Sequence, residues 1–182
     1  MNAISNLEDV IAELGKTFSG KLLRPGEIGY EEARRVHNGL IDKRPALIAQ
    51  CRGVADVVEA VKLARSSQLE VAVRGGGHNV AGRATVDGGI MIDLSHMASV
   101  RVDPKNRKAW VVGGATWADV NRETQLHGLA VTGGVVSSTG VGGLTLGGGL
   151  GWLMGMYGLA LDNLISVELV TAEGEVVHAS VD

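Results

Sequence analysis

The stretch VRGGGHNVAG, residues 73–82, places three consecutive glycines in front of a histidine, directly after an apolar run. An interior glycine costs roughly 0.5–1 kcal/mol relative to alanine, because more chain entropy is lost on folding. Such a run indicates that something must approach the backbone closely. Consecutive N–H groups of a glycine-rich turn form a concave nest that binds anionic oxygens. We therefore expect the backbone of residues 75–79 to bind an anion, assisted by Arg74 and Asn79.

A second glycine cluster, STGVGGLTLGGGLGW (138–152), offers another nest at the start of a helix predicted over 144–150. Two nests in a neighbourhood without charged residues suit a ligand that carries a pyrophosphate and a flat ring. Tight turns, where helices pack closely on a sheet, would explain the same glycines. The residues alone do not decide between these two interpretations.

Composition limits the kind of partner. The chain has 182 residues, 27 of them glycine, a net charge of −3 and 3% aromatic residues. It lacks the basic patch of a phosphate-backbone binder and the aromatic platforms on which single strands stack, so no nucleic acid is expected. Cys51 is the only cysteine, which excludes a disulfide framework and a cysteine-based metal site. The acidic residues near the start do not fit a signal peptide, so we expect a cytoplasmic protein.

The segment between Gly128 and Leu161 contains no charged residue and has GxxxG spacings, which also occur in membrane helices. Its apolar residues are diluted by glycine, serine and threonine, and no lysine or arginine flank anchors either end. A buried loop and helix that face a ligand are the better interpretation. We expect no membrane partner.

Hydrophobic periodicity predicts helices over 6–14, over 30–37 and from residue 54, a buried strand over 46–50, and further strands over 70–76 and 88–95. At least two of these strands should pair in parallel. The second half changes character: it predicts a hairpin over 99–114, a helix that Thr116 caps and Gly128 ends, and a hairpin that turns at 172–175. We place the boundary between two subdomains so that they span residues 1–97 and 98–182.

Several common motifs fail on inspection. No segment satisfies the dinucleotide pattern GxGxxG, and GKTFSGK (15–21) has Leu22 where a phosphate-binding loop needs serine or threonine. Ser137 and Ser138 do not lie in a GxSxG elbow. Four histidines without metal-ligand spacing are interpreted as surface or locally satisfied side chains. They are His37, His96, His127 and His178.

Five ordered segments resemble the FAD-binding domain of the vanillyl-alcohol-oxidase/p-cresol-methylhydroxylase (PCMH) superfamily, and within it the berberine-bridge-enzyme-like FAD-linked oxidases. The segments are VRGGGHNVAG, GGIMIDLSHMASVRVD, GGATWADV, GVGGLTLGGGLGWLMGMYGL and DNLISVELVTAEGEVV. The resemblance covers roughly residues 40–182. It implies an α+β fold of the FAD-binding PCMH type, in which a small parallel α/β subdomain packs on an antiparallel-sheet subdomain.

The resemblance also implies the roles of single residues. His78 matches the histidine that many members link covalently to the flavin 8α-methyl group. Val136 stands where some members carry a second linking cysteine, so we expect one covalent link at most. The other implied FAD-binding residues lie in the first loop and the second loop. They are Arg74, Gly75, Gly76, Gly77, Asn79 and Gly82, and Val135, Thr139, Gly140, Gly142 and Gly143.

The implied function is that of the FAD-binding portion of a flavin-dependent oxidoreductase or oxidase. Such an enzyme takes a hydride from a small organic substrate to FAD and passes electrons to oxygen or another acceptor. Members of the family are more than twice this length, so we expect the substrate domain and the catalytic residues to be absent and the fragment alone to be inactive. Two alternatives stay open: a non-catalytic flavin or nucleotide-binding module that acts with a partner chain, and a flavin-dependent reductase of the enolpyruvyl-sugar type. Substrate and oligomeric state are not predicted.

Overall fold

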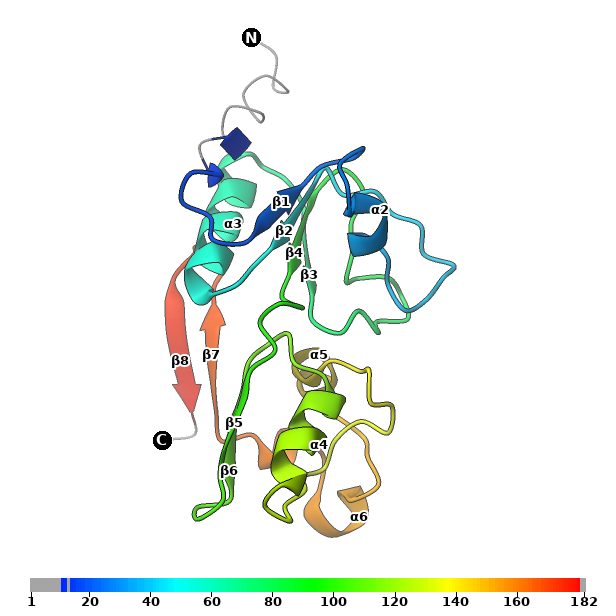
Figure 1. Cartoon of the computed structure of the whole chain (residues 1–182), viewed down its shortest axis with the longest axis vertical. Coiled ribbons are helices and arrows are strands. Elements are labelled where there is room, and N and C mark those ends of the chain that lie inside the picture. The colour runs from blue at the N-terminus through cyan, green and yellow to red at the C-terminus, as the bar shows by residue number, and fades with distance from the viewer. Residues whose placement is uncertain (1–10, 13, 181–182) are drawn as a thin grey trace.

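The first half of the chain is built on a mixed four-stranded sheet (Figure 1). The computed structural model describes residues 11, 12 and 14–180, so the helix predicted over 6–14 lies largely outside the described residues. In order across the sheet, the strands are β1 (Lys21–Leu23), β2 (Leu47–Gln50), β4 (Ile90–Asp93) and β3 (Val71–Arg74). The pairs β2–β4 and β3–β4 are parallel, as predicted, whereas the unpredicted β1 pairs antiparallel with β2.

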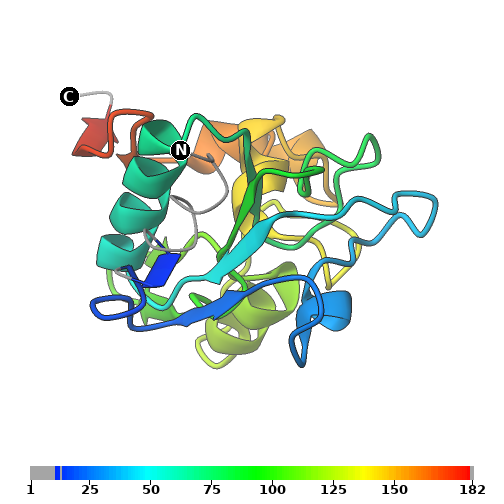
Figure 2. The ribbon, with the colours of Figure 1, turned by 90° about the horizontal axis from the view of Figure 1, so that it is seen from above.

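Both faces of this sheet are covered, which explains why its central strands are continuous apolar runs. Leu47 and Ile92 point into a core shared with α3 (Val54–Ser66). Ile48 and Met91 point to the other face, where Tyr30 of α2 (Tyr30–Ala33) packs on them. The view from above shows α3 and α2 on opposite sides of the sheet (Figure 2).

Helix α2 is shorter than the helix predicted over 30–37, since it ends at Ala33. The reason is a side chain from another strand. Nη1 of Arg74 donates to the carbonyl oxygens of Ala33 (2.7 Å) and Arg35 (3.1 Å). These carbonyls therefore have a partner without a further helical turn, and the chain leaves the helix toward the end of the sheet.

The second half consists of hairpins and short helices around a small core. Strands β5 (Val100–Asp103) and β6 (Lys108–Val111) form one hairpin, and β7 (Ser166–Val170) and β8 (Val176–Ser180) form another. Both antiparallel hairpins were predicted, and they form two separate two-stranded sheets. Helix α4 (Trp117–Gln125) begins with a capping box between Thr116 and Asp119. Trp117 and Val120 of this helix are buried against Ala160.

The last hairpin lies beside the first half. Strand β7 runs next to α3 (Figure 1), Arg65 of α3 faces Glu173 at 4.0 Å, and Gly174 packs on Lys62. The division into subdomains 1–97 and 98–182 stays a prediction. No helix in the described part of the chain is long and apolar enough to cross a membrane.

Helix α5 (Val141–Leu146) begins three residues earlier and ends four residues earlier than the helix predicted over 144–150. The difference follows from two glycines. Gly148 (φ +99°) and Gly149 (φ +81°) have left-handed backbone, which ends the helix. A Cβ on Gly149 would lie 2.5 Å from Cβ of Ala160, so the turn is also tightly packed. Beyond it follow α6 (Met154–Tyr157) and a 3-10 turn (Leu161–Asn163).

Candidate functional site

A pocket of about 400 Å³ lies at the carboxyl ends of the parallel strands, between the sheet and the second half. This is the edge at which open α/β sheets usually bind ligands. The first half contributes Arg35, Val36, His37, Arg74, Gly75, Gly76, Gly77, His78, Ser95 and Ala98 to its lining, and the second half contributes Gly114, Thr116, Asp119 and Ser138.

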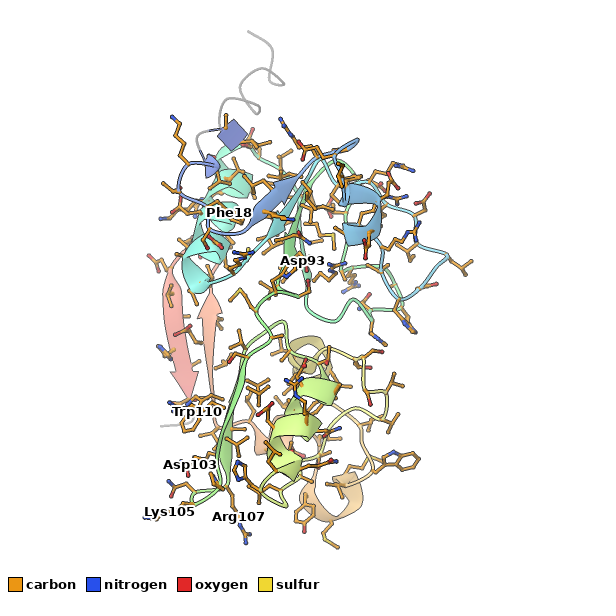
Figure 3. All side chains as sticks on the ribbon, in the orientation of Figure 1. Phe18, Asp93, Asp103, Lys105, Arg107 and Trp110 are labelled. Atoms are coloured by element: carbon orange, nitrogen blue, oxygen red, sulfur yellow. The ribbon has the colours of Figure 1, made fainter. Side chains whose placement is uncertain are left out.

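The glycine loop leaves β3 from a buried ion pair. Nε of Arg74 donates to Oδ1 of Asp93 at 3.0 Å, and Nη2 donates to Oδ2 at 2.6 Å. Asp93 is fully buried at the end of β4, between the two halves of the molecule (Figure 3). Burial alone would raise the pKa of Asp93, but the hydrogen bonds and charge of Arg74, together with Ser95, lower it below its ordinary value. Arg74 therefore positions the loop, and its charge is already matched by a carboxylate.

The backbone of the loop is rich in free donors. Among the residues that the structure describes, no acceptor takes the amide hydrogens of the consecutive residues from Gly75 to Asn79. Three of these residues line the pocket as glycines, without a side chain to cover their amides. The loop therefore has a row of N–H groups without a described acceptor beside a cavity, and that they form an anion-binding nest stays a prediction.

The two glycine clusters meet in space. A Cβ on Gly76 would lie 2.2 Å from the amide nitrogen of Gly140, and a Cβ on Gly140 would lie 2.3 Å from the amide nitrogen of Gly76. These two glycines are therefore required by the contact between the loops, whatever binds there. In the first turn of α5, the amides of Gly142 and Gly143 also find no acceptor within the described residues. The second loop thus adds two donors close to the junction.

His78 joins the two loops through its ring. Its Nε2 lies 3.0 Å from Oγ of Ser138, and its Nδ1 lies 3.4 Å from Oγ1 of Thr139. The ring stacks on His37, with centroids 4.0 Å apart and planes inclined by 11°. Burial lowers the pKa of His78, and the neighbouring His37 lowers it further, so the neutral imidazole is favoured.

The other residues predicted for the site do not all reach the pocket. Oδ1 of Asn79 accepts from the amides of Ala81 and Arg83 at 3.1 Å, so this side chain shapes the turn instead of facing a ligand. Gly82 (φ +71°) completes the same turn. Val135 and Val136 are 59% and 49% exposed and do not line the pocket.

Sequence reasoning missed part of the lining. His37 was interpreted as a surface or locally satisfied histidine, and it is exposed, but it also stacks on His78 and lines the pocket, which was not predicted. Arg35 and Ser138 also line it, although neither was predicted. Ser138 directly precedes the predicted Thr139, which was the available signal. Nothing in the sequence around His37 points to residue 78, because the contact depends on Arg74 drawing the end of α2 toward the loop. No group of three or more possible ligands for a metal ion occurs in the described part.

Comparison with known proteins gives consistent matches. Residues 45–180 match the family described as FAD binding domain. The (R)-6-hydroxynicotine oxidase of Paenarthrobacter nicotinovorans is 39% identical over 166 residues, which are 91% of this chain and 36% of that protein. The crystal structure of 6-hydroxy-D-nicotine oxidase from Arthrobacter nicotinovorans superposes with a TM-score of 0.88 at 39% identity, covering 90% of this chain and 36% of the other.

Two further solved structures match over nearly the whole chain. The berberine-bridge-enzyme-like protein 1 of Physcomitrella patens has a TM-score of 0.87 at 27% identity, covering 96% of this chain and 37% of that chain. The glucooligosaccharide oxidase of Acremonium strictum, described with 6-S-cysteinyl, 8α-N1-histidyl FAD, has a TM-score of 0.87 at 30% identity, covering 94% and 36%. The chain therefore spans little more than a third of the length of the relatives it matches, and the predicted fold class is confirmed.

Proposed function

The chain belongs to the FAD binding domain family, and from this premise we propose that it is the FAD-binding portion of a flavin-dependent oxidoreductase. The complete enzyme would take a hydride from a small organic substrate to FAD and pass the electrons to oxygen or another acceptor. Its relatives support this proposal, since they are named as oxidases and FAD-linked oxidoreductases. The substrate-binding residues would lie in the part of the relatives that this chain does not cover.

One observation carries the assignment of the pocket: the row of unpaired amides from Gly75 to Asn79. Unpaired N–H groups beside a cavity are costly where they are buried, unless water or a ligand accepts from them. A pyrophosphate offers several anionic oxygens within a short distance, and backbone N–H groups bind such oxygens without a full positive charge. The loop therefore fits the pyrophosphate of FAD.

The charges around the pocket also fit an anion. Asp119 is its one carboxylate in the described lining, and it already accepts from the amide and hydroxyl of Thr116 at 2.9 Å and 2.8 Å. The charge of Arg74 is matched by Asp93. Arg35 remains a cation with no hydrogen bond or ion pair from its side chain within the described residues. An anionic group in the pocket would thus be attracted by the guanidinium of Arg35, and the ionised Asp119, which accepts two hydrogen bonds from Thr116, would weaken that attraction.

When bound, FAD supplies the redox chemistry, and the residues of this chain hold and orient it. The amides of both loops would bind the phosphates. His78 would face the flavin ring with a neutral imidazole, and we propose that one of its nitrogens bonds to the 8α-methyl carbon. This link would replace one methyl C–H bond and one imidazole N–H bond, and the two electrons released would reduce the flavin and pass from it to oxygen or another acceptor. The 8α-histidyl FAD named for the Acremonium strictum oxidase supports this link. A second link through sulfur is not proposed, because Cys51 is fully buried.

Flavin titration tests the assignment of the pocket. The chain, produced free of flavin in a riboflavin-deprived host, is titrated with FAD, FMN and riboflavin while the quenching of flavin fluorescence is followed. If the amides hold a pyrophosphate, affinity falls in the order FAD, FMN, riboflavin, because FMN keeps one phosphate and riboflavin none. Equal affinity for FAD and riboflavin would refute the phosphate nest. Absence of binding to all three would refute the proposal that this chain suffices to hold the cofactor.

A further inference from the structure

The contact between His37 and His78 is fixed from the backbone as well as from the rings. The amide of His37 donates to the carbonyl oxygen of Gly77 at 3.0 Å. Two residues earlier, the carbonyl of Arg35 accepts from Arg74, whose guanidinium also holds Asp93. The segment that carries His37 is therefore anchored to the same ion pair that begins the glycine loop. The two imidazoles face each other because the segment that carries His37 and the glycine loop that carries His78 are both held by the Arg74–Asp93 ion pair.

The ring nitrogens of His78 both face hydroxyl groups, those of Ser138 and Thr139. A neutral imidazole has one donor and one acceptor nitrogen, and a hydroxyl can serve either of them. These two contacts are therefore compatible with both tautomers of the neutral ring. They are also compatible with the protonated ring, if both hydroxyl oxygens act as acceptors. What limits His78 to the neutral form must come from elsewhere.

The charged groups that face the two rings do not favour protonation. Arg35, from the segment after α2, carries the same charge as an imidazolium. Arg74, at the end of β3, is neutralised by Asp93 of β4, and Asp119 of α4 is held by Thr116. The other ring of the stack, His37, would add a further positive charge if protonated. Asp119, the one carboxylate of the described lining, keeps its negative charge, but the causes of the lowered pKa of His78 are burial and His37 and do not include Asp119.

We propose that His37 is a positioning residue, whose stacked ring covers one face of His78 and holds it as a neutral imidazole in a single orientation toward the pocket. The relevance of this role for flavin attachment rests on the proposed function, since a neutral nitrogen is needed for bonding to carbon. The stack itself depends only on the fold. The lowered pKa of His78 agrees with it, because burial is the main cause and the charge of the neighbouring His37 acts in the same direction.

The test follows the ring of His78 by NMR with isotope-labelled histidine in the chain free of flavin. The wild-type chain should show one neutral tautomer of His78 at neutral pH and a titration below the ordinary value of 6.5. His37→Ala should raise the pKa of His78 and give a mixture of tautomers or ring orientations. His37→Phe keeps a flat ring on the same face and should preserve the single orientation. His127→Ala, at an exposed histidine elsewhere, should change neither property.

Two outcomes would overturn the proposal. One is a His37→Ala chain in which the titration and tautomer of His78 stay as in the wild type. The other is a His37→Phe chain, folded by circular dichroism, in which His78 loses its single orientation as fully as with alanine. If His37→Ala fails to fold, the phenylalanine variant alone carries the test. Flavin titration of the same samples is a separate readout: a chain with the expected NMR behaviour that binds no FAD refutes the proposed function and leaves the positioning role intact.

Discussion

Arg74 and Asp93 form the ion pair on which two walls of the pocket depend. Asp93 is fully buried, the side chain of Arg74 is 14% exposed, and the closest nitrogen and oxygen lie 2.6 Å apart. Through the carbonyls of Ala33 and Arg35, the same guanidinium holds the segment that leads to His37. The pair thus connects the end of β3, the end of β4 and the end of α2. Its loss should affect both stability and the stacking of His37 on His78.

The first prediction concerns this pair. Asp93→Asn leaves a nearly buried guanidinium without its carboxylate, and breaking such a pair typically costs about 3–5 kcal/mol. Urea denaturation should show a loss of this size. Glu123→Gln, in an exposed pair with Arg122, is the control and should change the free energy of unfolding by less than about 1 kcal/mol. Similar losses in both variants would contradict a structural role that depends on burial.

The pH dependence of stability follows from the same group. The pKa of Asp93 is lower in the folded chain than its ordinary value of 3.8. Its contribution to stability is therefore fully present above that value and is lost as the pH falls through it toward the folded pKa. Below pH 3.8, the free energy of unfolding of Asp93→Asn should therefore fall less steeply with decreasing pH than that of the wild type. An unchanged slope in circular dichroism titrations would show that Asp93 does not contribute.

The contact of Gly76 with Gly140 gives a further prediction. A Cβ on Gly76 would lie 2.2 Å from a backbone nitrogen, which cannot move without shifting the second loop. Gly76→Ala should therefore destabilise the chain by roughly 1–3 kcal/mol, as overpacking usually does. The control is Gly155→Ala in α6, where a Cβ meets nothing within 4 Å and a small gain in helix propensity is expected. Equal thermal midpoints for the two variants would be incompatible with the close approach of the loops.

Much of the fold could be predicted from the pattern of apolar residues. Continuous apolar runs such as 46–50 and 88–95 are typical of strands in a parallel sheet that is covered on both faces. Helix ends were predicted less well. The end of α2 is set by Arg74, which lies 41 residues away in the sequence from Ala33. The end of α5 is set by left-handed glycines at 148 and 149. A glycine in the sequence does not show which sign its φ will take.

The candidate site could be predicted where glycines mark a close approach of backbone. Residues 75–78 line the pocket, and the second loop meets this loop at Gly140. His37 and Arg35 could not be found in this way, since their place depends on a long-range contact with Arg74. Arg74 was predicted to bind the ligand, whereas most of its N–H groups donate to Asp93 and to the carbonyl oxygen of Ala33. A buried carboxylate partner at Asp93 is visible only in three dimensions.

Cys51 should be chemically inert in the folded chain. Burial raises the pKa of its thiol to about 12, and the charges of Asp56 and Asp93 act in the same direction. Since the thiolate is the reactive form, a maleimide dye should not label the native protein at neutral pH. Labelling should become complete in denaturant, which is the internal control. Rapid labelling of the native chain would contradict the buried position of Cys51.

Arg35 should contribute to the binding of FAD through its charge. The side chain lines the pocket and is exposed, so its attraction to a phosphate is screened by water and is worth about 0.2–1 kcal/mol. Arg35→Gln should weaken the binding of FAD by a factor between about 1.4 and 5, and that of riboflavin hardly at all. Arg107→Gln, at the tip of the β5–β6 hairpin and far from Asp93 (Figure 3), is the matched control. Equal weakening of FAD and riboflavin would assign Arg35 to the ring or the fold instead of the phosphates.

His78 is expected to be the point of covalent flavin attachment. Its ring lies at the junction of both loops and is kept neutral, so a nitrogen lone pair is available once Ser138 or Thr139 releases it. After expression with ample riboflavin, a denaturing gel viewed under ultraviolet light should show a fluorescent band for the wild type and for His127→Ala. His78→Ala should give a dark band. The other imidazole near this junction in the described structure is His37, and we do not expect it to replace His78, because its ring stacks on that of His78. A dark wild-type band from a chain that nevertheless binds FAD would show that the cofactor is held without a covalent bond, whereas a fluorescent His78→Ala band would move the attachment to another residue.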